Sequence, residues 1–235
     1  MTTRVITKSF AVPINFTEFW SGRLGLSLIT ASLVVLIFVI TPFREAAVPG
    51  RFVLDLIILV LMILGALAVN QSRFTTASVL VLVLATGALL GVGRLHPSPV
   101  FHQIGSILAT ATLLLYFRIV LLVMFRKGPI NWSRIQGGIC AYLLLGMAWA
   151  SAYQVLEQAC PGSFQFVTRP RDLDQVVAKL TYYSFSTLTT VGGEVTAISP
   201  IARSLTVAEA AVGQLFPAIL IGALVSMAME SRAKS

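Results

Sequence analysis

Long apolar stretches alternate with short polar ones along most of the chain. A helix that crosses the roughly 30 Å hydrocarbon core of a bilayer needs about 20 mainly apolar residues. Prolines, charges and other polar residues delimit six such stretches, which predict spans at 24–41, 52–69, 75–93, 103–125, 135–156 and 202–229. Because proline cannot donate a backbone hydrogen bond, Pro42 is expected to end the first span.

The segment between the fifth and sixth spans has a different pattern. Asp174 is expected to cap a short amphipathic helix at 175–188. An extended stretch containing Gly192 and Gly193 follows, and a polar exit leads to Pro200. The preceding residues, 157–174, are polar and include prolines and a glycine, so we expect a loop there. This segment is the part of the chain around which the spans are organised.

Composition places the chain in a membrane. Of its 235 residues, 57% are hydrophobic and 11% are charged, whereas soluble domains carry roughly a quarter charged residues. Backbone polar groups must be satisfied inside the bilayer, so apolar runs of this length are expected to be helical. A net charge of +8 would suggest nucleic acid as the partner of a soluble protein, but here the basic residues flank the spans. We therefore expect the lipid bilayer, and not nucleic acid, as a partner.

The number of spans predicts the orientation. Six spans place both termini on one side of the membrane, and a modest excess of Lys and Arg on that side assigns it to the cytoplasm. The chain is therefore expected to be a multi-pass protein of the plasma membrane, such as the bacterial inner membrane, with both termini cytoplasmic.

Cysteine and histidine positions indicate neither a disulfide nor a metal site. Cys140 falls inside the fifth span and Cys160 beyond its far end, so the two are not expected to pair within one chain. No spacing of ligands typical of a metal site is present. No nucleophile and base fall at a common depth, so the sequence does not predict an enzyme, and no cofactor is expected.

The end of the short helix carries a specific motif. The residues that carry it are Tyr182-Tyr183-Ser184-Phe185, Thr189-Thr190-Val191-Gly192, Thr196, Pro200, Ala202-Arg203-Ser204-Leu205 and Gly213-Gln214-Leu215. This pattern resembles the pore loop of potassium channels, whose signature reads T-T-V-G-Y-G-D, and it covers roughly the last 60 to 100 residues. The alternative, a simple Gly turn between two helices, is weaker because the position, the flanking residues and the topology all agree with a pore loop.

The resemblance implies a fold and a site. It implies an all-α membrane protein of six transmembrane helices, with a re-entrant pore helix and filter loop between the fifth and sixth, and a homotetrameric pore to which each chain contributes one loop. The selectivity filter would be formed by Thr189, Thr190, Val191, Gly192, Gly193 and Glu194. In such filters, rings of backbone carbonyls replace the water around a permeating ion. The resemblance implies monovalent cations as the permeant ions: K⁺ from the family, with Na⁺ as a second candidate because the filter is shortened.

The chain departs from the signature at one place. Gly192 is followed by Gly193 and Glu194, so the tyrosine between the two glycines is missing. Losing one residue removes about one carbonyl ring and the aromatic side chain that braces the strand. We therefore expect a cation channel that discriminates weakly among monovalent cations. A non-conducting, channel-like subunit or interaction protein is the alternative that the missing tyrosine leaves open.

The last span has the features of a pore-lining helix. By resemblance, Gly213 occupies the position of a hinge, and Pro217 one turn later predicts a bend. Gln214, Pro217, Ile221 and Val225 share one helical face and are expected to line the cavity. Ile221 and Val225 would form an apolar constriction that gates by dewetting. Ordinary helix packing of that face is the alternative.

Two charged residues fall inside predicted spans. Glu209 is expected behind the filter, bonded to the pore helix or to Arg203, and not in the ion path. Arg118 is either an interface residue with its charge among the headgroups or a buried partner of a carboxylate or carbonyl. It stands without the ladder of Arg and Lys at every third position that a voltage sensor needs, so the channel is not expected to be voltage-gated.

These features divide the chain into three parts. Residues 1–22 are either a short amphipathic segment at the membrane interface or an unstructured tail. Residues 23–128 form a four-helix transmembrane domain without the charge ladder of a sensor. Residues 129–235 form the pore domain, with outer helix, pore helix, filter and inner helix.

Overall fold

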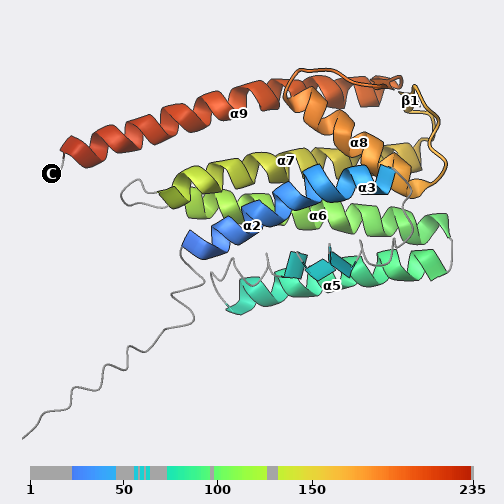
Figure 1. The fold of residues 1–235 in the computed structure, drawn as a ribbon, viewed down its shortest axis with the longest axis horizontal. Coiled ribbons are helices and arrows are strands. Elements are labelled where there is room, and N and C mark those ends of the chain that lie inside the picture. Colours follow the sequence, from blue (N-terminus) through green and yellow to red (C-terminus); the bar gives the residue numbers. More distant parts are fainter. Residues whose placement is uncertain are drawn as a thin grey trace, which may run out of the picture.

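The computed structural model describes residues 23–45, 56–57, 59–60, 62–63, 73–95, 98–125 and 132–233 (Figure 1). The predicted N-terminal segment, 1–22, and most of the second predicted span lie outside these residues. The described elements, in chain order, are α2 (Arg23–Val35), the π-helix η1 (Leu36–Ile40), α3 (Thr41–Glu45), α5 (Arg73–Leu95), α6 (Pro99–Met124), α7 (Trp132–Ala159), β1 (Phe164–Phe166), α8 (Leu173–Leu188), β2 (Val195–Ala197) and α9 (Pro200–Ala233).

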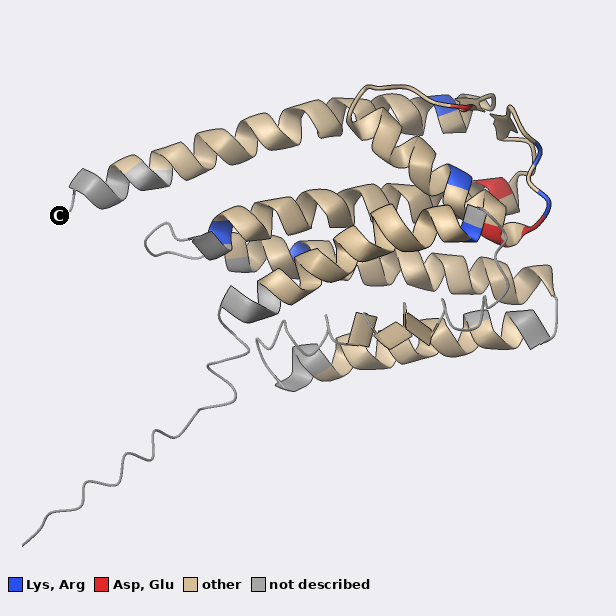
Figure 2. Ribbon diagram, viewed as in Figure 1, with Lys and Arg blue, Asp and Glu red and all other residues tan. Residues whose placement is uncertain are grey.

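The chain is a mostly helical membrane protein. Within the described residues, four helical stretches are long and apolar enough to cross a bilayer, Ser27–Arg44, Pro99–Leu122, Arg134–Ala159 and Pro200–Ser226. They correspond to the first, fourth, fifth and sixth predicted spans. The third is a helix, α5, whose apolar stretch Ala77–Gly93 is shorter. Most of the ribbon between the helix ends is uncharged, and the Lys, Arg, Asp and Glu residues visible in Figure 2 gather mainly near those ends.

The prediction that Pro42 ends the first span is wrong. The helix continues through Pro42 to Glu45 as α3. The π-helix η1 lies immediately before it, where the backbone N–H of Thr41 donates to the carbonyl of Leu36, five residues back. The hydroxyl of Thr41 donates to the same carbonyl at 2.9 Å. The wider turn changes the register of the hydrogen bonds next to a residue that cannot donate one, so the proline is accommodated without ending the helix.

Helix α7 lies at the centre of the fold and packs against α2, α6, α8 and α9. Figure 1 shows α2, α5, α6 and α7 running alongside one another, with the short α8 crossing obliquely between α7 and α9. Small residues allow membrane helices to approach closely. A Cβ added to Gly146 of α7 would lie 2.6 Å from Cζ of Phe185 and 3.0 Å from Cδ1 of Leu188. This glycine therefore lets the end of α8 rest directly on α7.

Polar contacts connect the helices that precede the pore loop. The hydroxyl of Thr110 on α6 donates to Ser151 on α7 at 2.8 Å, and Ser27 on α2 donates to Gln136 on α7 at 3.1 Å. The hydroxyl of Tyr116 on α6 donates to the carbonyl of Met62 at 2.7 Å. Each such bond contributes about 0.6 kcal/mol on average in a membrane protein, so packing of the apolar core supplies most of the attraction.

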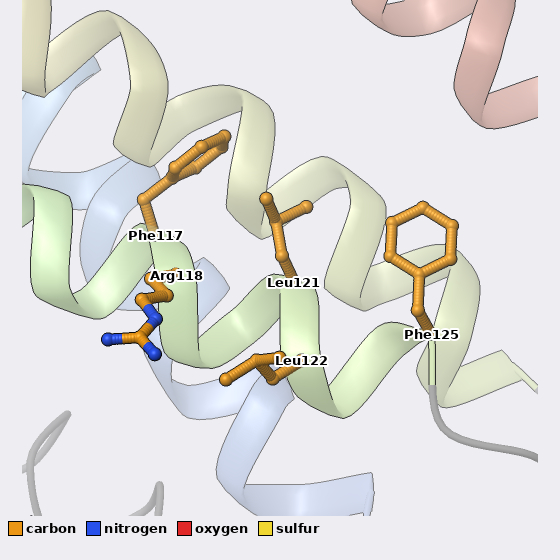
Figure 3. Close-up of a pocket in the computed structure, with 5 residues that line it drawn as sticks. All are labelled: Phe117, Arg118, Leu121, Leu122 and Phe125. Carbon is orange, nitrogen blue, oxygen red and sulfur yellow. The ribbon is translucent and has the colours of Figure 1, made fainter.

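A shallow apolar groove on α6 surrounds the charge inside the fourth span. The residues that line it are Phe117, Arg118, Leu121, Leu122 and Phe125 (Figure 3). The guanidinium group of Arg118 points away from Phe117 in this view, and the side chain is exposed. In the part of the chain that the structure describes, it has no ion-pair or hydrogen-bond partner. This placement favours the interface interpretation of Arg118 over the buried one.

The residues before and after the predicted filter form a two-stranded sheet that the sequence analysis missed. β1 and β2 pair antiparallel, with Phe164 opposite Ala197, Gln165 opposite Thr196 and Phe166 opposite Val195. The expected loop at 157–174 therefore contains a strand. The inner side chains of the sheet, Phe164 and Val195, join a buried cluster with Tyr153 of α7 and Tyr183 of α8. This cluster fixes the chain on both sides of α8 to the outer helix.

Candidate functional site

The start of α8 is set by a cap two residues earlier than predicted. Asp172, and not Asp174, is the N-cap residue, with extended backbone angles of φ −151° and ψ 173°. Its Oδ1 accepts from the backbone N–H of Gln175 at 3.0 Å, while Oε1 of Gln175 accepts from the backbone N–H of Arg171 at 2.8 Å. The helix begins earlier because this reciprocal pair satisfies N–H groups that have no partner inside the helix. Asp174 lies in the first turn, where its negative charge interacts favourably with the helix dipole.

The backbone after α8 leaves the helix through an unusual conformation. Thr190 has φ 58° and Gly192 has φ 78°, whereas Val191 and Gly193 do not have positive φ. A positive φ costs a residue with a Cβ about 1–2 kcal/mol, and for a β-branched threonine it is a rare conformation that is often found at functional sites. Alternation of left-handed residues with others directs neighbouring carbonyl groups toward the same side of a chain.

Contacts along one side hold this segment to α8. The backbone N–H groups of Val191 and Gly192 donate to the carbonyl of Ser186 at 2.9 and 3.4 Å. A Cβ on Gly193 would lie 2.8 Å from the ring of Tyr182 and 3.1 Å from Oγ of Ser186, so no other residue fits there without movement. In the isolated chain the residues from 189 to 194 are all exposed. The segment is thus supported on one side and open on the other.

An ion pair and a backbone bond hold the far end of the segment. Nζ of Lys179, a largely buried residue on α8, lies 3.8 Å from Oε2 of Glu194. The side chain of Glu194 is itself 63% exposed. The backbone N–H of Val167, after β1, donates to the carbonyl of Glu194 at 3.1 Å. Glu194 therefore joins the filter segment to both α8 and the sheet.

The inner helix α9 touches the opposite end of the segment. A Cβ on Gly213 would lie 2.6 Å from the carbonyl oxygen and 2.8 Å from Cα of Leu188, the last residue of α8. The two backbones can approach this closely only because residue 213 is a glycine. Helix α9 continues without interruption through Gly213 and Pro217. The structure thus gives Gly213 a packing role, and it does not test the expected hinge.

Residues 139–230 match a family model described as an ion channel. This part of the chain is an ion-channel domain of the potassium-channel superfamily. The matched region contains α8, the segment 189–194 and nearly all of α9, and the match points to a channel rather than an enzyme. No curated protein and no solved structure matches the chain.

Most of the residues predicted to line the cavity are exposed to solvent when one chain is considered alone. Gln214, Ile221 and Val225 are exposed and Pro217 is half-buried. Only 11% of the apolar stretch of α9 is buried within the chain. The structure brings Gly213 to the base of the segment 189–194, whereas Ile221 and Val225 lie two and three turns further along α9.

Glu209 is buried behind the segment, as predicted, and bonds to the pore helix. Its Oε1 and Oε2 lie 2.5 Å from the hydroxyls of Ser184 on α8 and Tyr153 on α7. Arg203, the other partner that the sequence left open, instead donates from Nε to the carbonyl of Ala197 at 3.3 Å.

Several residues that support the segment were missed by the sequence analysis. Lys179, Tyr182 and Ser186 lie on α8, and Tyr182 and Ser186 are separated by one helical turn. That spacing could have indicated a face directed at the segment. No comparable signal indicated Lys179, because its partner Glu194 is far along the chain.

Proposed function

We propose that four copies of this channel domain surround a common axis and conduct monovalent cations, K⁺ and Na⁺, with weak discrimination between them. The observation that carries the proposal is the segment 189–194. It is supported by α8 on one side, is exposed on the other, and has left-handed residues at alternate positions. Thr189, Thr190, Val191, Gly192, Gly193 and Glu194 would form the ion path, with their open side facing the axis.

The case for a fourfold assembly rests on what a single chain leaves incomplete. One chain supplies one pore segment, whereas an ion that has lost its water needs ligands on all sides. Large apolar side chains of α9, including Val207, Leu215 and Ile219, are more than half exposed. Other copies or lipid would cover this face in the membrane. In the complete assembly, the pore helix would be re-entrant, between the fifth and sixth of six spans.

Weak selectivity follows from the short filter. Selecting K⁺ over Na⁺ requires several carbonyl rings at a controlled distance from the axis. The segment lacks the residue between Gly192 and Gly193, and two adjacent glycines restrict the backbone least. Glu194 adds a carboxylate at the mouth, which attracts cations but distinguishes poorly between those of equal charge. We place the filter mouth outside a plasma membrane, with both termini in the cytoplasm.

Two measurements on purified protein test the proposal. Native mass in mild detergent is expected to equal four chains, and liposomes that contain the protein are expected to take up both Na⁺ and K⁺. Replacing Val191 by a lysine would place four positive charges in the path, so this variant should assemble but carry no cation flux. A monomeric or trimeric mass would contradict the assembly. Equal flux in the Val191→Lys variant would contradict the assigned path.

Substituting the two residues of the ion pair at the mouth, Lys179 and Glu194, is expected to change block by external Ca²⁺ in opposite directions. Glu194→Gln removes four negative charges from the assembly, so block by external Ca²⁺ should weaken by about three- to tenfold. Lys179→Gln removes the opposing positive charges and should strengthen that block by a similar factor. Both effects should shrink between low and high salt, because the Debye length falls to about 3 Å at 1 M. Block titrations in planar bilayers measure both variants, and equal block in all three proteins would be contrary to this account.

Voltage is expected to have little effect on opening. Gating energy scales with the charge moved, about 2.3 kcal/mol per elementary charge per 100 mV. Helix α6 carries Arg118 as its one Lys or Arg between Pro99 and Met124. Conductance should therefore vary shallowly with voltage. A curve steep enough to need several charges per subunit would overturn this expectation.

A further inference from the structure

Glu209 is a buried acid with no counter-charge beside it. It lies on α9, one turn before Gly213, and its side chain is fully buried. Among the Asp and Glu residues whose burial the structure describes, it is the only buried one. Burying an ionised carboxylate is costly unless it is paired with a positive charge or well hydrogen-bonded. The groups around Glu209 therefore decide in which form the protein can carry it.

Hydroxyl groups from two other helices face the carboxyl group. Tyr153 of α7 lies 2.5 Å from Oε2, and Ser184 of α8 lies 2.5 Å from Oε1. The nearby hydroxyl of Tyr183 on α8 is engaged with Thr206 of α9 at 2.7 Å. Within the described part of the chain, no Lys or Arg forms an ion pair with Glu209. The carboxyl group is thus surrounded by neutral groups.

Counting protons distinguishes the two forms of Glu209. Oγ of Ser184 lies 2.5 Å from Oε1 of Glu209 and also 2.8 Å from the carbonyl oxygen of Gly146 on α7. A serine hydroxyl has one proton and can donate to only one of these two oxygens. If Glu209 is ionised, one of the two contacts joins two acceptors. If Glu209 carries a proton on Oε1, it donates to Ser184, Ser184 donates to Gly146, and Tyr153 donates to Oε2, so every contact has one donor.

We infer that Glu209 is carried as the neutral carboxylic acid and is a positioning residue of the filter. In this form, its proton begins a chain of hydrogen bonds from the inner helix through the pore helix to the outer helix. The inference rests on the proposed function where it concerns ion flux, but the protonation state itself does not depend on it.

The position of these hydrogen bonds explains how Glu209 can act on the filter. Glu209 meets Ser184 and Gly213 meets Leu188, so the same four-residue step separates the contacts on both helices. Between Ser184 and Leu188 lies Ser186, whose carbonyl accepts the N–H groups of Val191 and Gly192. A shift of α8 relative to α9 would therefore move the backbone of the filter segment directly.

Three variants distinguish a neutral Glu209 that acts as a proton donor from an ionised Glu209 that acts through its charge. Glu209→Gln keeps one donor and one acceptor, and its amide can replace the neutral acid toward both Ser184 and Tyr153. Glu209→Leu keeps the approximate volume but removes both the donor to Ser184 and the acceptor of the Tyr153 hydroxyl. Tyr153→Phe removes one donor to Glu209 and leaves the bond with Ser184. We expect cation flux and the K⁺ to Na⁺ ratio of Glu209→Gln within about threefold of the unchanged protein, and flux of Glu209→Leu at least about tenfold lower. Tyr153→Phe should fall between them.

A spectroscopic measurement tests the protonation state without any ion flux. Infrared spectra of the purified protein at neutral pH should contain the carbonyl stretching band of a protonated carboxylic acid that is absent from Glu209→Gln. Such a band, with Glu209→Gln similar to the unchanged protein in flux and thermal stability, supports the inference. Absence of the band, or a Glu209→Gln variant as impaired as Glu209→Leu, overturns it. If the unchanged protein carries no flux, the proposed function fails, while the band and the order of thermal stabilities still decide on Glu209.

Discussion

Insertion of a tyrosine between Gly192 and Gly193 is expected to raise the preference for K⁺ over Na⁺ by about tenfold, which corresponds to about 1.4 kcal/mol. The insertion restores one residue of the filter and so about one carbonyl ring. It also restores an aromatic side chain that can brace the strand from behind. Space exists at this point in the chain, since a Cβ on Gly192 would meet no atom within 4 Å. Reversal potentials in mixed Na⁺ and K⁺ measure the change.

An alanine at the same place is the matched control for the inserted tyrosine. It restores the length of the filter without the aromatic group. If both insertions raise K⁺ preference equally, length alone limits the natural filter. If only the tyrosine does so, lateral bracing is the missing element. An unchanged preference after both insertions would mean that 189–194 does not set selectivity.

The second large effect is expected for Gly213→Ala. Alanine favours a helix over glycine by about 1 kcal/mol, so propensity alone predicts a more stable protein. The new Cβ would, however, lie 2.6 Å from the carbonyl oxygen and 2.8 Å from Cα of Leu188, which are backbone atoms that cannot rotate away. We expect α9 to be pushed from α8, with a loss of thermal stability of the assembly and at least about a tenfold loss of flux.

Gly222→Ala on the same helix is the control for this substitution. A Cβ there would meet nothing within 4 Å in the chain, so the propensity gain should remain and stability should be unchanged or slightly higher. A glycine hinge at 213 would have a different signature, because Gly213→Ala would then alter the lifetimes of open and closed states while leaving thermal stability intact. Equal effects of the two substitutions on stability would contradict the packing role of Gly213.

Apolar patterns predicted the four long apolar helical stretches that the structure describes, because membrane spans depend mainly on length and hydrophobicity. The predicted span 135–156 lies within α7, Trp132–Ala159, and the predicted short helix 175–188 lies within α8, Leu173–Leu188. The signature Thr189 to Gly192 located the segment with unusual backbone angles, because Gly192 indeed has positive φ. These features depend on residues that are close together in the sequence.

Features that depend on distant residues were not predictable in the same way. The pairing of Phe164 with Ala197 joins a strand of three residues to another beyond the filter, and such short strands have no periodic signal. Pro42 was expected to end the helix, as proline usually does, but the preceding π-helix lets the helix continue through it. Asp172 and Asp174 lie in the same turn and either could cap the helix, so the sequence alone did not distinguish between them. Lys179 gained its role only when the fold brought Glu194 beside it.

The reversal potential of currents through the unmodified protein tests the central claim most directly. Purified protein is placed in a planar bilayer with Na⁺ as the cation on one side, K⁺ as the cation on the other, and equal chloride concentrations on both sides. The proposed filter predicts a cation current that reverses close to zero, since both ions pass. A reversal potential that follows K⁺ alone would contradict weak selectivity. No current from the unmodified protein, together with current after tyrosine insertion, would show that the natural filter does not conduct.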